Sequence, residues 1–223
     1  MSRRRPRTTR AAVTAAAASA VLLLASCAPG SPSTSEPGAT DDPGRFAVDV
    51  DVDTPQLRQA KKRAGIEECP TPDGAAPEAT NPMPEVTLAC FGGGPAVDLT
   101  GLRGPLVLNL WAQWCPPCRE ELPFYQQLHE QAGEQVTVLG VDYQDTRPDW
   151  AMDLLEQTGV TYPNLADPGG KLRVPFRVRG LPGIVFVDEA GEVTAVEYVV
   201  IESYDQLADL VDEHLGVAVG TAG

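Results

Sequence analysis

The sequence is poor in basic residues once its first 26 positions are set aside. Those positions contain 5 of the 17 lysines and arginines and none of the 31 aspartates and glutamates, which leaves 12 basic against 31 acidic residues. Nucleic acids and anionic lipids attract basic surfaces. The remaining chain therefore lacks the charge of a nucleic-acid-binding protein, and its acidic excess mainly favours solubility.

Histidine is also scarce, which weakens the case for a metal site. The two histidines, His129 and His214, lie in helical patterns, where solvent-exposed or capping roles are expected. The other possible ligands for a tetrahedral zinc ion are Cys69, Cys90, Cys115 and Cys118. Their spacing is poor for such a site. We expect no metal and no cofactor.

The apolar run near the N-terminus, residues 11–24, is too short to span a bilayer comfortably. It follows five arginines and ends in Leu24-Ala25-Ser26-Cys27, an order typical of an export signal that matches the lipobox of bacterial lipoproteins. We predict cleavage before Cys27 and its lipidation. The protein would then lie on the extracytoplasmic face of a bacterial membrane, held by lipid. An uncleaved signal anchor is the alternative.

The composition divides the rest of the chain. Residues 28–45 have almost no large apolar side chain and resemble a flexible tether. Thr54, Pro55 and Gly65 are typical of the cap, first turn and end of a short helix, and five prolines from Pro70 to Pro84 exclude regular structure. The predicted segments are a signal peptide (1–26), a lipidated tether (27–45), a helix with a proline-rich segment (46–84), one domain (85–216) and a tail (217–223).

Apolar runs alternate with helical patterns across residues 85–216 and predict an α/β domain with a central mixed sheet flanked by helices. The expected strands are 86–90, 96–99, 106–111, 136–141, 162–166, 183–187 and 192–199, and the expected helices are 117–131, 148–157 and 204–215. The first two strands would form a hairpin across the glycines at 92–94.

Cys115 and Cys118 lie two residues apart where the strand at 106–111 passes into the helix at 117–131. The unpaired amides and the dipole of a helix N-terminus stabilise a thiolate relative to a thiol. We therefore predict that Cys115 is a nucleophile and that this pair carries out disulfide exchange.

These residues resemble those of thioredoxin-like proteins, and among them the membrane-tethered ResA/TlpA-type thiol-disulfide oxidoreductases. The resemblance covers about residues 85–216. The matching motifs are Leu110-Trp111-Ala112-Gln113-Trp114, Cys115-Pro116-Pro117-Cys118, Arg119-Glu120-Glu121-Leu122-Pro123 and Gly180-Leu181-Pro182. The resemblance implies a thioredoxin-like fold with an N-terminal hairpin. The 64 positions from Cys118 to Pro182 further imply an inserted strand and helix.

The resemblance also implies that the Leu181–Pro182 peptide is cis and faces the cysteine pair. A substrate strand could then pair with the Leu181 backbone beside Cys115. The local sequence alone leaves a trans proline at the entry of a strand equally open. The family often has a hydroxyl residue after this proline, and Gly183 departs from that pattern.

Two further residues are expected to face the substrate. Trp114 and Pro116 flank the reactive cysteine, and Trp114 should cover the motif. Trp111 is expected to pack in the core instead.

Exchange begins when the Cys115 thiolate attacks a substrate disulfide, and it ends when Cys118 attacks Cys115 and releases the reduced substrate. Cys118 must lose a proton to act. The buried aspartate that serves thioredoxins is replaced here by Asn109, and the resemblance implies Glu121 as the substitute. The alternative for Glu121 is a surface carboxylate that supports the start of the helix.

The two residues between the cysteines bear on the direction of exchange. Pro116 and Pro117 have no N–H, so neither can donate a hydrogen bond to the Cys115 thiolate. Weaker stabilisation of the thiolate makes the reduced form less favoured. We therefore predict a reductant rather than a strong oxidant.

Cys69 and Cys90 remain after Cys27 and the exchange pair are assigned. In an exported chain the default expectation is a structural disulfide, which would fasten the proline-rich segment to the hairpin. A second redox function for this pair is the alternative.

The sequence therefore predicts an extracytoplasmic thiol-disulfide reductase. The resemblance implies that its substrates are exported proteins with disulfides, above all apocytochrome c, and that a membrane thiol-disulfide carrier supplies its electrons. The alternative is a general oxidoreductase or isomerase for exported proteins.

Overall fold

The fold is built around the apolar run that precedes the cysteines. In the computed structural model, which describes residues 49–72 and 79–220, this run is β3 (Leu106–Trp111), and each of its residues is buried. β4 (Thr137–Tyr143) and β5 (Asn164–Asp167) continue the sheet on one side, parallel to β3. β6 (Gly183–Val187) and β7 (Val193–Glu197) continue it on the other side. β6 pairs antiparallel with β3, and β7 pairs antiparallel with β6. A strand covered on both faces has a continuous apolar sequence.

The predicted hairpin forms the far edge of this sheet. β1 (Thr87–Cys90) pairs antiparallel with both β2 (Val97–Asp98) and β5, which gives the strand order β2-β1-β5-β4-β3-β6-β7. β2 is shorter than expected because the chain turns into a 3-10 helix at Leu99. The Asp98 side chain caps that helix by accepting a hydrogen bond from the Thr100 amide.

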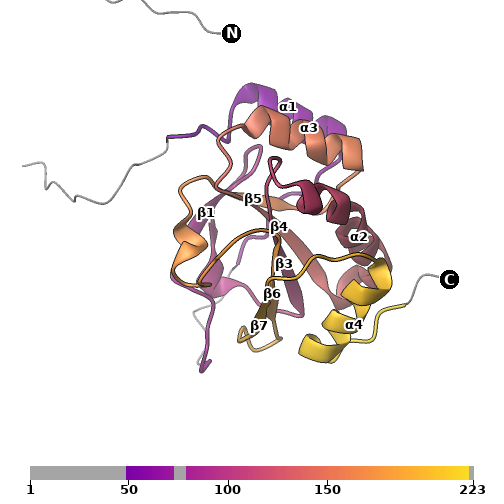
Figure 1. Ribbon diagram of the computed structural model, residues 1–223. Helices are drawn as coiled ribbons and strands as arrows, with labels where there is room; N and C mark the ends of the chain where they lie inside the picture. The colour runs from indigo at the N-terminus through magenta and orange to yellow at the C-terminus, as the bar shows by residue number, and fades with distance from the viewer. Residues whose placement is uncertain (1–48, 73–78, 221–223) are drawn as a thin grey trace, which may run out of the picture. The chain divides into compact units, whose positions relative to one another are not determined.

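The four α-helices of the described residues cover one face of the sheet, with α1 beside α3 and α2 beside α4 (Figure 1). They are α1 (Pro55–Ala64), α2 (Pro116–Ala132), α3 (Pro148–Thr158) and α4 (Tyr204–Leu215). Buried side chains from all four belong to one hydrophobic cluster. α1 therefore packs in the same compact unit as residues 85–216, although it precedes the predicted domain boundary.

The predicted ends of the helices are explained by their caps. The Thr54 side chain accepts a hydrogen bond from the Leu57 amide at the start of α1. Gly65, Gly159 and Gly216 end α1, α3 and α4 in the left-handed conformation that glycine tolerates best.

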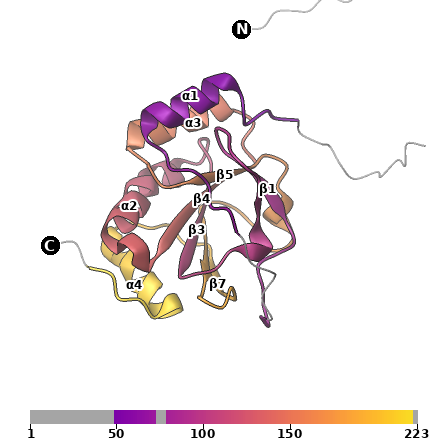
Figure 2. The same cartoon turned by 180° about the vertical axis from the view of Figure 1, so that it is seen from behind.

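The opposite face of the sheet is covered by short segments rather than long helices (Figure 2). Leu99 and Leu102 come from the first 3-10 helix and its end, and Leu172 comes from a 3-10 helix at Lys171–Arg173. A third 3-10 helix, Gly133–Gln135, follows α2. None of the three was predicted, because such short helices leave little periodic pattern in a sequence.

The predicted insertion between Cys118 and Pro182 consists of α3 and β5. α3 leaves the end of β4 and returns the chain to β5, which pairs with β4 in parallel. This parallel crossover separates the cysteine helix from the strand that follows Pro182.

The predicted signal peptide and the whole predicted tether, including Cys27, lie outside the described residues. Of the proline-rich segment, the described part includes one isolated bridge between Pro82 and Glu192. Among the described residues, no helix combines the length and the apolar character needed to cross a membrane.

Candidate active site

The two cysteines of the exchange motif occupy the start of α2, as predicted. Cys115 is the N-cap residue, and Pro116 and Pro117 take the first helical positions, where a missing N–H costs no helical hydrogen bond. Cys115 and Cys118 are joined by a disulfide. The Cys118 amide lies 3.3 Å from the Cys115 Sγ and donates to it. The reduced Cys115 would therefore have one amide donor and the helix dipole, and no donor from the two prolines.

Trp114 and Pro116 are exposed on either side of Cys115. Cys115 itself is only 3% exposed, whereas Trp114 is 51% exposed. The Trp114 indole N–H donates to the Gln144 carbonyl at 3.3 Å, so the ring is anchored to the loop after β4. Trp114 therefore presents an apolar face to solvent beside the motif.

A pair of buried carboxyl groups fixes the loop that leads into the motif. Asp145 accepts hydrogen bonds from the Gln113 amide at 3.0 Å and the Arg147 amide at 2.8 Å. Asp142 forms a hydrogen bond with Asp145, and its pKa is raised well above its usual value by burial, by the charge of Asp145 and by that hydrogen bond. Asp145 thus holds the loop through both of its carboxyl oxygens. Neither residue was predicted from the sequence.

The Leu181–Pro182 peptide is cis, as predicted. Gly183, the next residue, pairs with Leu110 at the end of β3. β3 leads into the cysteine motif. This pairing therefore brings the cis-proline loop, which precedes β6, to the same end of the central strands as Cys115. Pro182 is buried and Leu181 is half-buried. The Gly104–Pro105 peptide is also cis, which the sequence analysis did not anticipate.

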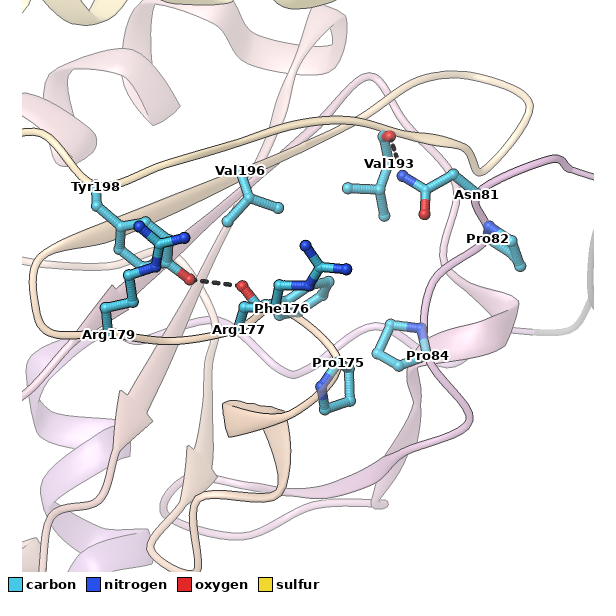
Figure 3. Close-up of a pocket in the computed structure, with 10 residues that line it drawn as sticks. All are labelled: Asn81, Pro82, Pro84, Pro175, Phe176, Arg177, Arg179, Val193, Val196 and Tyr198. Carbon is cyan, nitrogen blue, oxygen red and sulfur yellow. Dashed lines mark hydrogen bonds between the residues drawn. The ribbon is translucent and has the colours of Figure 1, made fainter.

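A pocket lies next to the cis-proline loop but contains none of the predicted site residues (Figure 3). Its walls are the chain segments around Pro82, around Phe176 and around Tyr198. The Tyr198 hydroxyl donates to the Phe176 carbonyl at 2.8 Å and closes one side. The pocket shares no lining residue with the cysteine motif.

Glu121 lies one helical turn after Cys118 and is fully buried, which rules out the alternative of a surface carboxylate. Its Oε1 accepts a hydrogen bond from the Ile201 amide at 2.8 Å, and its Oε2 has no partner among the described residues. Burial raises the pKa of Glu121 to about 7, against the lowering effect of the Ile201 amide, and the charge of Glu120 adds to the rise. Such a group can take up and release a proton near neutral pH.

Asn109 occupies the centre of the sheet close to this carboxyl group. Its Nδ2 lies 3.4 Å from the Tyr162 hydroxyl, and its Oδ1 has no partner among the described residues. Burial raises the pKa values of Tyr125 and Tyr162, and the charge of Glu121 adds to the rise, so these side chains share one buried region. Glu121 is the one carboxyl group in this set.

Trp111 packs in the core, as predicted, and also makes a specific polar contact. Its indole N–H donates to the Asn164 Oδ1 at 3.0 Å. Gly140 lies against the same amide group, and any Cβ at position 140 would collide with Asn164. The end of β3 is thus fastened to β5 across β4.

Cys69 and Cys90 form the second predicted disulfide. The bond joins the proline-rich segment to β1. One residue beside it was not predicted from the sequence. Lys61 of α1 is buried, and its Nζ lies 3.3 Å from the Cys90 Sγ. A buried lysine could not be recognised from the exposed pattern of Lys61-Lys62-Arg63.

Of the two roles expected for the histidines, exposure to solvent is not what the structure shows, whereas both residues do lie in the last turn of a helix, where a capping role was expected. The His214 ring packs 4.7 Å from the Phe186 ring, and the His129 ring meets the edge of Tyr162. Both are partly buried because they lie on the inner sides of α4 and α2. Within residues 49–72 and 79–220, no group of three or more potential ligands is placed to hold a metal ion.

Comparison with known proteins places this geometry in a family. The Redoxin family model matches residues 78–211, more than half of the chain. The thiol:disulfide interchange protein HelX of Rhodobacter capsulatus is 39% identical over 88 residues, which are 39% of this chain and 48% of HelX. DsbE of Allochromatium vinosum is 31% identical over 137 residues, 61% of this chain and 68% of DsbE. The chain thus spans about half the length of HelX and two thirds of DsbE.

The fold also resembles solved structures of proteins named disulfide oxidoreductases or their homologues. A DsbF homologue from Corynebacterium diphtheriae superposes with a TM-score of 0.51 at 28% identity, over 67% of this chain and 99% of its own. A secreted disulfide oxidoreductase of Mycobacterium tuberculosis has a TM-score of 0.51 at 25% identity, over 58% of this chain and 96% of its own. The predicted thioredoxin-like fold is confirmed, and the chain belongs to the Redoxin family, with relatives named thiol-disulfide oxidoreductases.

Proposed function

We propose that this protein is a thiol-disulfide oxidoreductase that reduces disulfides of exported proteins. The observation that carries the proposal is the Cys115–Cys118 disulfide at the start of α2, with the cis-proline loop at the same end of the central strands. The names of the relatives support the reaction class. Cys115, Cys118 and Glu121 are the catalytic residues of the proposal.

The reaction consists of two exchanges between sulfur atoms. The Cys115 thiolate attacks one sulfur of the substrate disulfide, a mixed disulfide forms, and the other substrate sulfur leaves as a thiolate. Cys118 then loses its proton, attacks the Cys115 Sγ and releases the second substrate thiol, which restores the bond seen in the structure. Glu121, one turn along the helix, accepts the Cys118 proton when its carboxyl group is ionised.

The substrate chain would bind where exposed apolar and backbone groups surround Cys115. Trp114 and Pro116 offer exposed surface, and Leu181 and Pro182 offer the backbone of the cis-proline loop. We propose that these four residues contact the substrate. Gly183 leaves this side without the hydroxyl group that the family often has.

The direction of exchange follows from the donors around Cys115. Among the described residues, the Cys118 amide is the one backbone donor to the Cys115 Sγ, since Pro116 and Pro117 have no N–H. The Cys115 thiolate therefore receives limited stabilisation, which favours the disulfide and makes the dithiol a reductant. Electrons must then come from a membrane dithiol carrier that regenerates the dithiol.

The resemblance to ResA/TlpA-type proteins suggests one substrate above others, the cysteine pair of apocytochrome c. We propose that lipid on Cys27 holds the domain at the extracytoplasmic face of the membrane, where that substrate emerges. Many exported proteins share the same chemistry, so the partner has to be found by capture.

Replacement of the resolving cysteine captures the partner. Cys118→Ser should leave Cys115 joined to its substrate, because no thiol remains to release it. Mixed disulfides that contain a c-type apocytochrome would support the favoured role. Capture of unrelated secreted proteins alone would indicate a general oxidoreductase or isomerase.

The matched control for this capture is Cys115→Ser, which removes the attacking thiol. It should trap none of the proteins that Cys118→Ser traps. Equal capture by the two variants would contradict the assigned roles of the cysteines.

A further inference from the structure

Lys61 is a buried cation placed against the second disulfide. It is 4% exposed, although its neighbours Lys62 and Arg63 on α1 are exposed. Its Nζ lies 3.0 Å from the Glu68 Oε2, 3.0 Å from the Gly93 carbonyl oxygen and 3.3 Å from the Cys90 Sγ. Lysine is almost never fully buried unless it is paired, and one of its three partners here is a sulfur atom.

The backbone around Cys90 is shaped to admit this ammonium group. Gly92, Gly93 and Gly94 all have positive φ values, so the chain bends around the lysine side chain and turns the Gly93 carbonyl toward Nζ. A Cβ at Gly92 would lie 3.0 Å from the Lys61 Cβ. The glycines therefore allow the close approach of Lys61 to Cys90.

The two sulfurs of this disulfide have opposite electrostatic surroundings. The Cys90 Sγ faces the Lys61 ammonium group, which stabilises a thiolate. The Cys69 Sγ lies 3.3 Å from the Asn164 carbonyl oxygen, which favours a thiol that donates a hydrogen bond. Reduction of the bond would thus give a thiolate at Cys90 and a thiol at Cys69.

Burial does not distinguish this pair from the exchange motif. Cys69 is 4% exposed and Cys90 is 2% exposed, compared with 3% for Cys115. In each pair one cysteine is slightly more exposed than the other, and in the second pair it is Cys69.

We propose that Cys69–Cys90 is a second exchangeable disulfide of this protein, in which Lys61 stabilises Cys90 as the leaving thiolate. A dithiol reductant attacks the Cys69 Sγ through one thiolate, a mixed disulfide forms at Cys69, and Cys90 leaves as a thiolate paired with Lys61. The second thiolate of the reductant then attacks the reductant sulfur that is bonded to the Cys69 Sγ. Cys69 leaves and takes up a proton, and the reductant becomes a disulfide. Two electrons pass from the dithiol to the Cys69–Cys90 pair.

This site goes beyond the function proposed for Cys115 and Cys118 and does not depend on it. The bond can still fasten the proline-rich segment to β1 in its oxidised form. The contact with Lys61 favours its reduction, because the ammonium group stabilises the Cys90 thiolate that forms.

The redox state of each cysteine pair can be measured separately, because trypsin releases the two pairs in different peptides. Trypsin cuts after Arg63, Arg103 and Arg119, so residues 64–103 carry both Cys69 and Cys90 and residues 104–119 carry both Cys115 and Cys118. The full-length folded protein is equilibrated in dithiothreitol redox buffers, alkylated and digested with trypsin. The peptides are then analysed by mass spectrometry. The mass of each peptide gives the fraction of its pair that is reduced, and circular dichroism confirms that the protein stays folded.

Lys61→Met removes the cation while keeping an apolar chain of similar length. It should lower the equilibrium constant for reduction of the Cys69–Cys90 peptide at least tenfold, about 30 mV for a two-electron couple. Lys62→Met is the matched control, because Lys62 is exposed on the same helix, and it should change the constant less than twofold. The peptide with Cys115 and Cys118 should titrate unchanged in both variants.

A second variant keeps the test decisive if Lys61→Met fails to fold. Glu68→Gln removes the carboxylate that competes with Cys90 for the Lys61 ammonium group, and Glu68 is exposed, so folding should persist. It should make reduction of the pair more favourable, by about twofold or more. A pair that opens only when the protein unfolds, or a constant that stays within twofold in these variants, would overturn the proposal and leave Lys61 a purely structural residue.

Discussion

At the scale of single residues, buried ionisable groups separate this protein from a generic disulfide-exchange domain. Glu121 was predicted because its position after Cys118 matches a family motif, and the structure adds the burial that raises its pKa to about 7. Lys61 and Asp142 could not be predicted. Their burial depends on residues distant in the sequence, such as Cys90 and Asp145, and no local pattern records such contacts.

The raised pKa of Glu121 makes stability depend on pH. Between its ordinary value of 4.5 and about 7, the folded state holds a proton that the unfolded state releases, so the free energy of unfolding falls as pH rises through this range. Glu121→Gln removes this loss. We expect the variant to gain stability relative to the native protein by about 1–3 kcal/mol between pH 5 and pH 8, as measured by urea unfolding. A difference that stays constant with pH would contradict the burial of an ionisable carboxyl group.

The same residue should control the release of substrate. When Glu121 is ionised it can accept the Cys118 proton, so the rate of mixed-disulfide resolution should rise with pH through about 7. Glu121→Gln should slow resolution about 100-fold at neutral pH and move the rise toward the pKa of Cys118 itself. Stopped-flow quenching with a disulfide peptide measures this rate. An unchanged pH profile would assign Glu121 a structural role only.

At the scale of elements, the longer helices and strands could be predicted from the sequence better than the contacts between them. β3, β6, α3 and α4 appear within a residue or two of the predicted bounds because apolar period, proline and glycine caps all act locally. The three 3-10 helices have no such pattern. The contact from Trp111 to Asn164 was equally invisible, because β5 joins β3 only through β4.

Gly140 tests that contact. A Cβ at this position of β4 would collide with the Asn164 amide group and break its hydrogen bond with Trp111. Gly140→Ala should lower the free energy of unfolding by about 1–3 kcal/mol. Gly169→Ala is the control, since an added Cβ there meets no atom within 4 Å, and it should be close to neutral. Equal midpoints in urea for the two variants would show that β4 can shift to make room.

At the scale of the whole molecule, the fold and the reaction class were predictable because the resemblance rests on motifs in the domain itself. The segments before the domain divide differently. α1 packs with α3 as part of the same unit, whereas the predicted signal peptide and Cys27 lie outside the described residues. The anchor therefore remains a prediction from sequence.

Labelling with a fatty acid in a bacterial host tests the anchor. The native chain should incorporate label at Cys27 and sediment with membranes, because acyl chains partition into the bilayer. Cys27→Ala should lose the label and the processing that precedes it. A variant that is still cleaved and still sediments with membranes would contradict the lipoprotein assignment.

The reduction potential of the Cys115–Cys118 pair decides whether this protein is a reductant. The protein is equilibrated with glutathione buffers of known ratio, and the pair is read from the peptide of residues 104–119. With one amide donor at Cys115 and prolines in the next two positions, we predict a potential nearer to that of thioredoxin, about −270 mV, than to that of strongly oxidising periplasmic proteins, about −120 mV. A value close to −120 mV would contradict the assignment as a reductant.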